Sequence, residues 1–161
     1  FSSCPNLQVV EFSSNSELLV IKDKAFSESA INKIFIPSHV LRIGESAFQM
    51  CLHLQNVEFS VDSELQIIDE SAFYVTMIQK IFIPSHVIKI SRSLFYGCEM
   101  LQVVEIPENS ELKCIDRNAF TFTQVRQIYI PKHVTSIDEN AFIDGALQLM
   151  ELSNEKLIVI I

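Results

Sequence analysis

Glycine and basic residues are scarce in this sequence, and both shortages narrow the classes of function. Only three glycines occur in 161 residues, which argues against phosphate loops and other sites where a ligand approaches the backbone closely. Twelve Lys and Arg stand against twenty Asp and Glu, so the formal net charge is −8. Because nucleic acids and anionic membrane surfaces are bound by clustered basic side chains, no nucleic-acid partner is expected.

Long apolar runs and a leader segment are also missing. The longest apolar run covers only the five residues 157–161, against the ~20 that a membrane-spanning helix needs, so no membrane insertion by this segment is expected. No charged region followed by an apolar one opens the chain, so no signal peptide is predicted. Phe1 falls in the middle of a repeat, and we therefore expect a fragment of a longer protein.

Phenylalanine recurs at alternating intervals of 25 and 22 residues, which together make a 47-residue double unit. The recurring residues are Phe1, Phe26, Phe48, Phe73, Phe95, Phe120 and Phe142. The repeats that contain these residues share one sequence pattern, which consists of L-x-x-I-x-I, a turn, and then L-x-x-I-x-x-x-A-F. Its first part begins seven times, at Leu7, Ile31, Leu54, Ile78, Leu101, Val125 and Leu147. This period and pattern are those of leucine-rich repeats, in which each repeat adds one short strand to a horseshoe.

The repeat predicts the fold class. We expect a repeat solenoid over residues 1–161, a single leucine-rich repeat array of about seven repeats of 22–25 residues. A parallel β-sheet should line the concave face, with short helical or irregular turns on the convex face. Strand alternation places Val10 and Phe12 inward and Val9 and Glu11 outward. Prolines should end the strands because they lack an N–H for the ladder: Pro37, Pro84, Pro107 and Pro131.

The recurring Phe has two interpretations. The favoured one is a buried column of rings on the convex side, each stacked on the rings of the neighbouring coils, and the competing one is a role in holding a ligand or cofactor. Because every ring sits at the same place in the repeat, we favour the column and expect no cofactor.

The cysteines and histidines recur with the same period. Cys4, Cys51 and Cys98 are 47 residues apart, so two coils, or ~10 Å, should separate them, too far for a disulfide. We interpret them as small thiols filling a turn, and Cys114 as a further core position. His39, His86 and His133 should alternate along one edge with Glu17, Glu64 and Glu111. This edge could be a solvated rim or an acid- or metal-dependent sensor; we favour the rim and predict no metal site, because two histidines never fall side by side.

No catalytic site is predicted. Ser and His are plentiful but each recurs as a repeat position, so none stands out beside a base and an orienting group. The chain is therefore expected not to be an enzyme.

The segments IPSHV, IGESAF and LQNVEFSVDSELQIIDESAF resemble the BspA-like leucine-rich repeats of the treponemal type, and the Ser-Glu-Leu variant resembles the set found in Trichomonas. The resemblance covers almost the whole chain and weakens at its ends. It implies a protein at the cell surface or secreted, implicated in adhesion to host proteins and cells.

The outward strand residues form the candidate protein-binding face. One column alternates carboxylates with aromatic rings, and its neighbour carries two lysines; the predicted contact residues are Glu11, Lys33, Phe35, Glu58, Lys80, Phe82, Glu105 and Tyr129. Exposed aromatics tend to anchor interfaces, although β-propensity and packing over lysine stems would also favour rings here.

We expect a host or extracellular-matrix protein as the partner of this face. The alternative is an intracellular scaffold or regulatory interaction domain, which unpaired cysteines would suit. Because repeats need neighbours to cover their apolar faces, both ends should be open and allow end-to-end self-association. The apolar tail at 157–161 is interpreted as a coil that stops midway.

Overall fold

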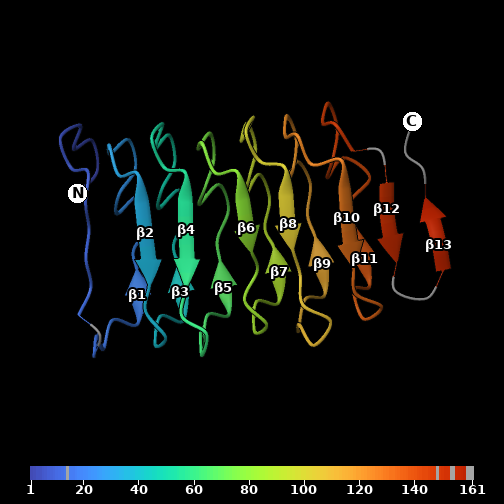
Figure 1. The fold of residues 1–161 in the computed structure, drawn as a ribbon, viewed down its shortest axis with the longest axis horizontal. Helices are drawn as coiled ribbons and strands as arrows, with labels where there is room; N and C mark the ends of the chain where they lie inside the picture. The colour runs from blue at the N-terminus through green and yellow to red at the C-terminus, as the bar shows by residue number, and fades with distance from the viewer. Residues whose placement is uncertain (14, 148, 153–154, 159–161) are drawn as a thin grey trace.

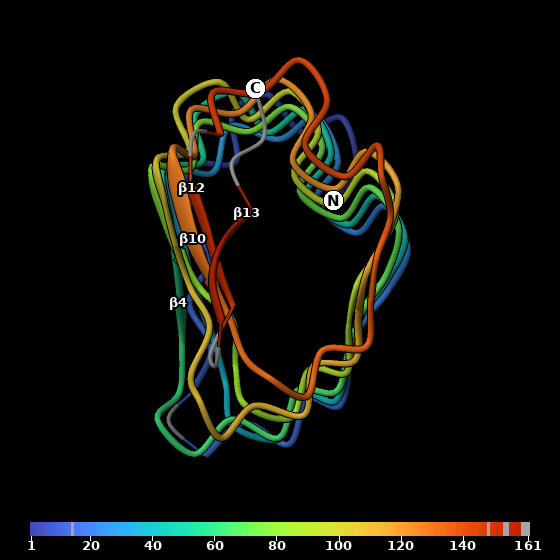
Figure 2. The same cartoon turned by 90° about the vertical axis from the view of Figure 1, so that its right-hand side faces the viewer.

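The fold is a solenoid whose coils are stacked side by side along one axis (Figure 1). The computed structural model describes residues 1–13, 15–147, 149–152 and 155–158, the last two ranges as backbone only. Each coil runs down a long strand, turns, rises through a very short strand and then passes through a turn that carries the recurring Phe. Seen along the stack, the long strands form one wall and the short strands and Phe turns form the opposite one (Figure 2).

The long strands follow the predicted inward and outward alternation. Ile34 and Ile81 point into the core at 2% and 1% exposure, whereas their neighbours Phe35 and Phe82 point outward. The strands pair in parallel, with Phe35 beside Glu58 and Phe82 beside Glu105. Val9 makes an isolated parallel bridge to Lys33. The long strands are β2 (Lys33–Ile36), β4 (Asn56–Phe59), β6 (Lys80–Phe82), β8 (Val103–Glu105), β10 (Gln127–Ile130) and β12 (Leu149–Leu152).

A second column of strands faces the first across the core, and the sequence pattern did not predict it. Its members have two residues each and pair in parallel in two groups, β1 with β3 and β5, and β7 with β9 and β11. Their bounds are β1 (Val20–Ile21), β3 (Arg42–Ile43), β5 (Ile67–Ile68), β7 (Lys89–Ile90), β9 (Cys114–Ile115) and β11 (Ser136–Ile137). In β1, β3, β5, β7 and β9 the second residue is buried and the first lies outward.

The prediction that Cys114 is a core residue is wrong. Cys114 is the outward residue of β9 and is half-buried, while Ile115 fills the core at 1% exposure. Val20 and Ile67, which align with Cys114, are 38% and 41% exposed. Cys114 does align with apolar residues of the other coils. Adjacent residues of a strand point to opposite sides, however, so only one of two neighbouring apolar residues can face inward.

The recurring phenylalanines form the predicted buried column. Phe48, Phe73, Phe95 and Phe120 are fully buried, and adjacent rings along the column stack nearly parallel with centroids 5.0–5.8 Å apart. Phe1 stacks on Phe26 but remains 77% exposed at the end of the column. Because burying a Phe side chain stabilises a protein by roughly 1.5–3 kcal/mol, this column is a major part of the core.

The turns that carry the Phe column are not helical, and the part of the chain that the structure describes contains no helix. Of the two expected forms of turn, helical or irregular, the described turns are irregular. Residues two before and two after the ring adopt a positive φ, for example Ser71 at 56° and Val75 at 51°. Their backbone N–H groups donate to the next coil, Ser71 to the carbonyl of Arg92 and Val75 to that of Tyr96, at 3.1 and 2.8 Å. This ladder between turns offsets the cost of a left-handed conformation in residues other than glycine.

The C-terminal strand departs from the spiral. β13 (Glu155–Ile158) runs antiparallel to β12, so residues 155–158 turn back along the last long strand. The interpretation of the tail as the start of another coil is wrong for Leu157 and Ile158, while residues 159–161 lie outside the described residues. An antiparallel neighbour satisfies backbone groups on one edge of β12 that a further parallel coil would otherwise bond.

Candidate protein-binding face

The outward side chains of the long strands form a surface that we call the long-strand face. Two of its rings stand half-exposed, Phe35 at 48% and Phe82 at 44%. They are outward because Ile34 and Ile81 in the same strands take the inward positions, and successive strand residues point to opposite sides. The face therefore presents apolar surface that the fold does not bury.

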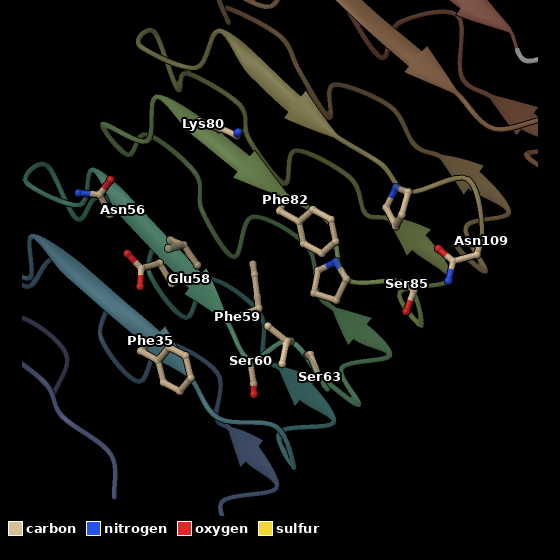
Figure 3. A pocket seen from close by; sticks show the side chains of 14 residues that line it. Phe35, Asn56, Glu58, Phe59, Ser60, Ser63, Lys80, Phe82, Ser85 and Asn109 are labelled. Carbon is tan, nitrogen blue, oxygen red and sulfur yellow. The ribbon is translucent and has the colours of Figure 1, made fainter. Parts of the chain in front are cut away.

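A groove of about 670 Å³ lies in this face. It brings together Phe35 from β2, Glu58 from β4, and Lys80 and Phe82 from β6 (Figure 3). The half-buried Phe59 and the loop 60–63 form one wall, and the turn at Pro84–Ser85 continues the lining toward Asn109. Apolar surface with a few polar groups is typical of a site that binds another molecule.

The position of the groove follows from the two-coil period of the sequence. Ladder hydrogen bonds join β2 to β4 and β6 to β8, but among the described residues none joins β4 to β6. The longer half of the double unit also carries the loop 60–63, whose residue Val61 is fully exposed. A break in the ladder beside a projecting loop leaves a hollow at this junction.

The charges of the face are only partly paired. Lys80 Nζ lies 2.7 Å from Glu105 Oε1, with both side chains about half-exposed at 58% and 49%. The Tyr129 hydroxyl donates to Glu108 Oε1 at 3.2 Å. Exposed pairs of this kind stabilise a fold by only ~0–1 kcal/mol. Their main effect is to determine which charged side chains of the face remain unpaired.

The eight predicted contact residues divide into two groups. Four of them line the groove together, namely Phe35, Glu58, Lys80 and Phe82. The other four lie outside its lining, with Glu11, Lys33 and Glu105 exposed and Tyr129 half-buried: they belong to the same outward columns of the repeat. Sequence reasoning did not find the wall formed by Phe59 and the loop 60–63. The one signal for it was the greater length of that half of the double unit.

The expected rim of Glu and His forms in part. His39 Nδ1 lies 3.5 Å from Glu64 Oε1, and His86 Nδ1 lies 2.8 Å from Glu111 Oε1. His133 differs, because its Nε2 lies 3.2 Å from the hydroxyl of Ser110. Within the described ranges, no three His, Cys, Asp or Glu side chains come together in a way that could hold a metal ion. These contacts are those of a solvated edge.

The cysteines are free thiols, and two of them are sealed in the core. Cys51 and Cys98 are fully buried and donate to the carbonyls of Phe26 and Phe73 at 3.0 and 3.1 Å. Burial raises the pKa of the Cys98 thiol to about 11 and also raises that of Cys51. The prediction of small buried thiols is confirmed for these two, whereas Cys4 is half-buried. A neutral, inaccessible thiol is a structural group and a poor nucleophile.

Ion pairs on the opposite wall join neighbouring coils. Arg42 reaches Asp69 Oδ2 with Nε at 2.6 Å and Asp23 Oδ1 with Nη2 at 3.1 Å. The hydrogen bond and charge of Asp69 raise the pKa of the Arg42 guanidinium. Lys89 Nζ lies 2.6 Å from Asp116 Oδ2, and that bond raises the Lys89 pKa. Arg42 and Lys89 on the short-strand wall are thus paired with carboxylates of neighbouring coils. Among the residues that the structure describes, no helix is long and apolar enough to cross a bilayer.

The parallel coils, their stacked Phe column and the groove between strands define the class of protein, a leucine-rich-repeat solenoid with a surface suited to protein interaction. The model of the BspA type leucine rich repeat region matches residues 1–64 and 19–148 in six copies. The chain therefore belongs to the BspA type leucine-rich repeat family, as the sequence resemblance predicted.

Solved structures support this fold. The chain resembles the pneumococcal vaccine antigen PcpA with a TM-score of 0.79 at 21% identity, over 85% of this chain and 36% of that one. It resembles a leucine rich cell surface protein from Faecalibacterium prausnitzii with a TM-score of 0.64 at 26% identity, over 92% of this chain and 46% of that one. The chain thus spans less than half the length of either protein. A search of curated protein sequences returned no match.

Proposed function

We propose that this chain is a protein-binding module of a cell-surface protein, and that a host or extracellular-matrix protein docks on the long-strand face. The single observation that carries the proposal is the groove of about 670 Å³ with the half-exposed rings of Phe35 and Phe82 beside it. Aromatic anchors in a partly apolar hollow are where interface energy concentrates. The surface location draws on the similar protein from Faecalibacterium prausnitzii, which is a leucine rich cell surface protein.

The test is a pull-down of extracellular-matrix and host proteins on the immobilised chain, repeated with Phe35, Phe82 and Tyr129 all replaced by Ser. We expect the triple variant to lose most of the captured protein, because interface anchors commonly contribute ~2 kcal/mol or more each. Phe82→Ser alone should leave the fold nearly intact, since this ring is 44% exposed, and should weaken binding.

A matched control separates loss of the site from loss of any exposed apolar group. Ile67 and Ile88 are 41% and 46% exposed and lie on the short-strand wall. The double variant Ile67→Ser, Ile88→Ser should capture partners as well as the unmodified chain. Equal capture by the triple aromatic variant, with an unchanged circular dichroism spectrum, would refute the proposed face. Unfolding of Phe82→Ser would instead place that ring in the core.

The second candidate is an intracellular scaffold, and the four free cysteines are the observation that favours it, because exported proteins usually pair their thiols. Burial of Cys51 and Cys98 weakens this argument, since an oxidant cannot reach them. Antibody labelling of intact cells that make the protein decides between the two. Labelling without permeabilisation supports the surface module, and labelling only after permeabilisation supports the scaffold.

A further inference from the structure

The outward column of the long-strand face alternates aromatic rings with carboxylates in the groove. Phe35 and Glu58 are register partners on β2 and β4, and Phe82 follows on β6. Figure 3 shows the two rings on either side of the strand that carries Glu58. The groove therefore has a negative charge between two aromatic side chains, all three on strands rather than on loops.

The spacing of these groups suits a cation. Hydrogen-bonded strands lie about 4.8 Å apart, and β4 and β6 are not hydrogen-bonded to each other, so strands β2 and β6, two coils apart, are separated by roughly 10 Å or more. A charged group seated over the exposed face of either ring would come within the ~6 Å over which a cation is attracted by an aromatic ring. The Glu58 carboxylate lines the same groove and would attract the charge of that group.

Glu58 also remains available. Its equivalent one double unit later, Glu105, is paired with Lys80 at 2.7 Å, whereas no ion pair to Glu58 occurs among the described residues. Lys33 holds the place equivalent to Lys80 but does not make the corresponding pair. One of two similar carboxylates is thus already paired, and the other lies in the groove without an ion pair, because Lys80 in the same lining is 2.7 Å from Glu105.

We infer that the groove accepts an arginine side chain, presented by an extended segment of the partner protein and laid against the exposed rings of Phe35 and Phe82 close to Glu58. A guanidinium is planar, stacks on aromatic faces and is less strongly hydrated than an ammonium group, so arginine fits this gap better than lysine. The net charge of −8 would also steer a basic segment toward the molecule. This inference rests on the proposed function, because it names the chemistry of the partner at that same face.

The test uses three short blocked peptides, Gly-Arg-Gly, Gly-Lys-Gly and Gly-citrulline-Gly, titrated into the ¹⁵N-labelled chain and followed by amide chemical shifts. We expect the arginine peptide to shift amides of β4 and β6 and to bind more tightly than the other two. Citrulline has the shape of arginine without its charge, so it isolates the electrostatic contribution. Glu58→Gln should weaken arginine binding about threefold to fivefold, which is the upper range for an exposed charge pair, and Phe82→Ser should weaken it by a similar factor.

The matched control is Glu70→Gln, because this exposed carboxylate follows β5 on the short-strand wall and lies outside the lining of the groove. Its affinity for the arginine peptide should stay within about twofold of the unmodified chain. Equal binding of arginine and citrulline, tighter binding of lysine, or an unchanged affinity in Glu58→Gln would each overturn the inference.

Failure of this inference can be told apart from failure of the proposed function. If the triple aromatic variant loses a captured protein that Glu58→Gln still binds fully, the docking face is supported and the arginine inference is refuted. If the triple aromatic variant also keeps the captured protein, the docking face itself is refuted.

Discussion

Replacing Phe73 by alanine removes one ring from the middle of the Phe column. Phe73 is fully buried, and its centroid lies 5.3 Å from that of Phe48 and 5.8 Å from that of Phe95. A fully buried Phe→Ala change costs about 3–5 kcal/mol. Loss of two stacked pairs, each contributing about 0.5–1.5 kcal/mol beyond burial, places Phe73→Ala in the upper part of that range.

Thermal unfolding followed by circular dichroism measures this loss. For a chain of this size 1 kcal/mol corresponds to roughly 2–4 °C, so the melting temperature of Phe73→Ala should fall by about 6–20 °C. Phe82→Ala is the matched control, because the same change of side chain is made at a ring that is 44% exposed, and it should cost far less. A fall of less than about a degree for Phe73→Ala would refute the buried column.

Three further predictions concern the turns and the edge. The Cys98 thiol has a pKa of about 11 in the folded protein, whereas an unfolded thiol ionises near 8.5. The stability that this neutral thiol contributes is therefore fully present below about pH 8.5 and is lost as pH rises toward 11. In urea unfolding at pH 8 to 10.5, the free energy of unfolding should fall less steeply with pH in Cys98→Ser than in the unmodified chain. Equal slopes in the two proteins would contradict this. Gly44→Ala should lower the free energy of unfolding measured in urea by about 1–3 kcal/mol, because its Cβ would lie 2.5 Å from the backbone N of Asp23; a neutral or stabilising effect would contradict the close approach. Glu111→Gln should change the free energy of unfolding by less than about 1 kcal/mol, because His86 and Glu111 are about half-exposed, and a larger loss in the same assay would show that the edge is more than a solvated rim.

Periodicity predicted those parts of the molecule that repeat in every coil. The spacing of the phenylalanines indicated the buried column, and the alternation at Ile34 and Phe35 indicated which side of each long strand faces outward. The 47-residue interval between Cys51 and Cys98 was enough to exclude a disulfide between them. Each of these features depends only on which positions come into register, and register is what a repeat specifies.

Features that depend on local backbone conformation were not predictable in the same way. The short strands have two residues each, so they show no alternation, and Cys114 was assigned to the core in error. The turns around the Phe column use left-handed residues such as Val75, where glycine or asparagine would have given a signal. The groove depends on the missing ladder between β4 and β6 and on how the loop 60–63 projects. Neither is visible in a pattern of apolar residues.

The docking face is the central claim, and backbone hydrogen–deuterium exchange of the chain with and without a captured partner tests it most directly. The account predicts that the partner slows exchange in β4, β6 and the loop 60–63, while the short strands β5 and β7 exchange as they do in the free chain. Protection of the short strands or of the Phe turns, with β4 and β6 unchanged, would contradict it.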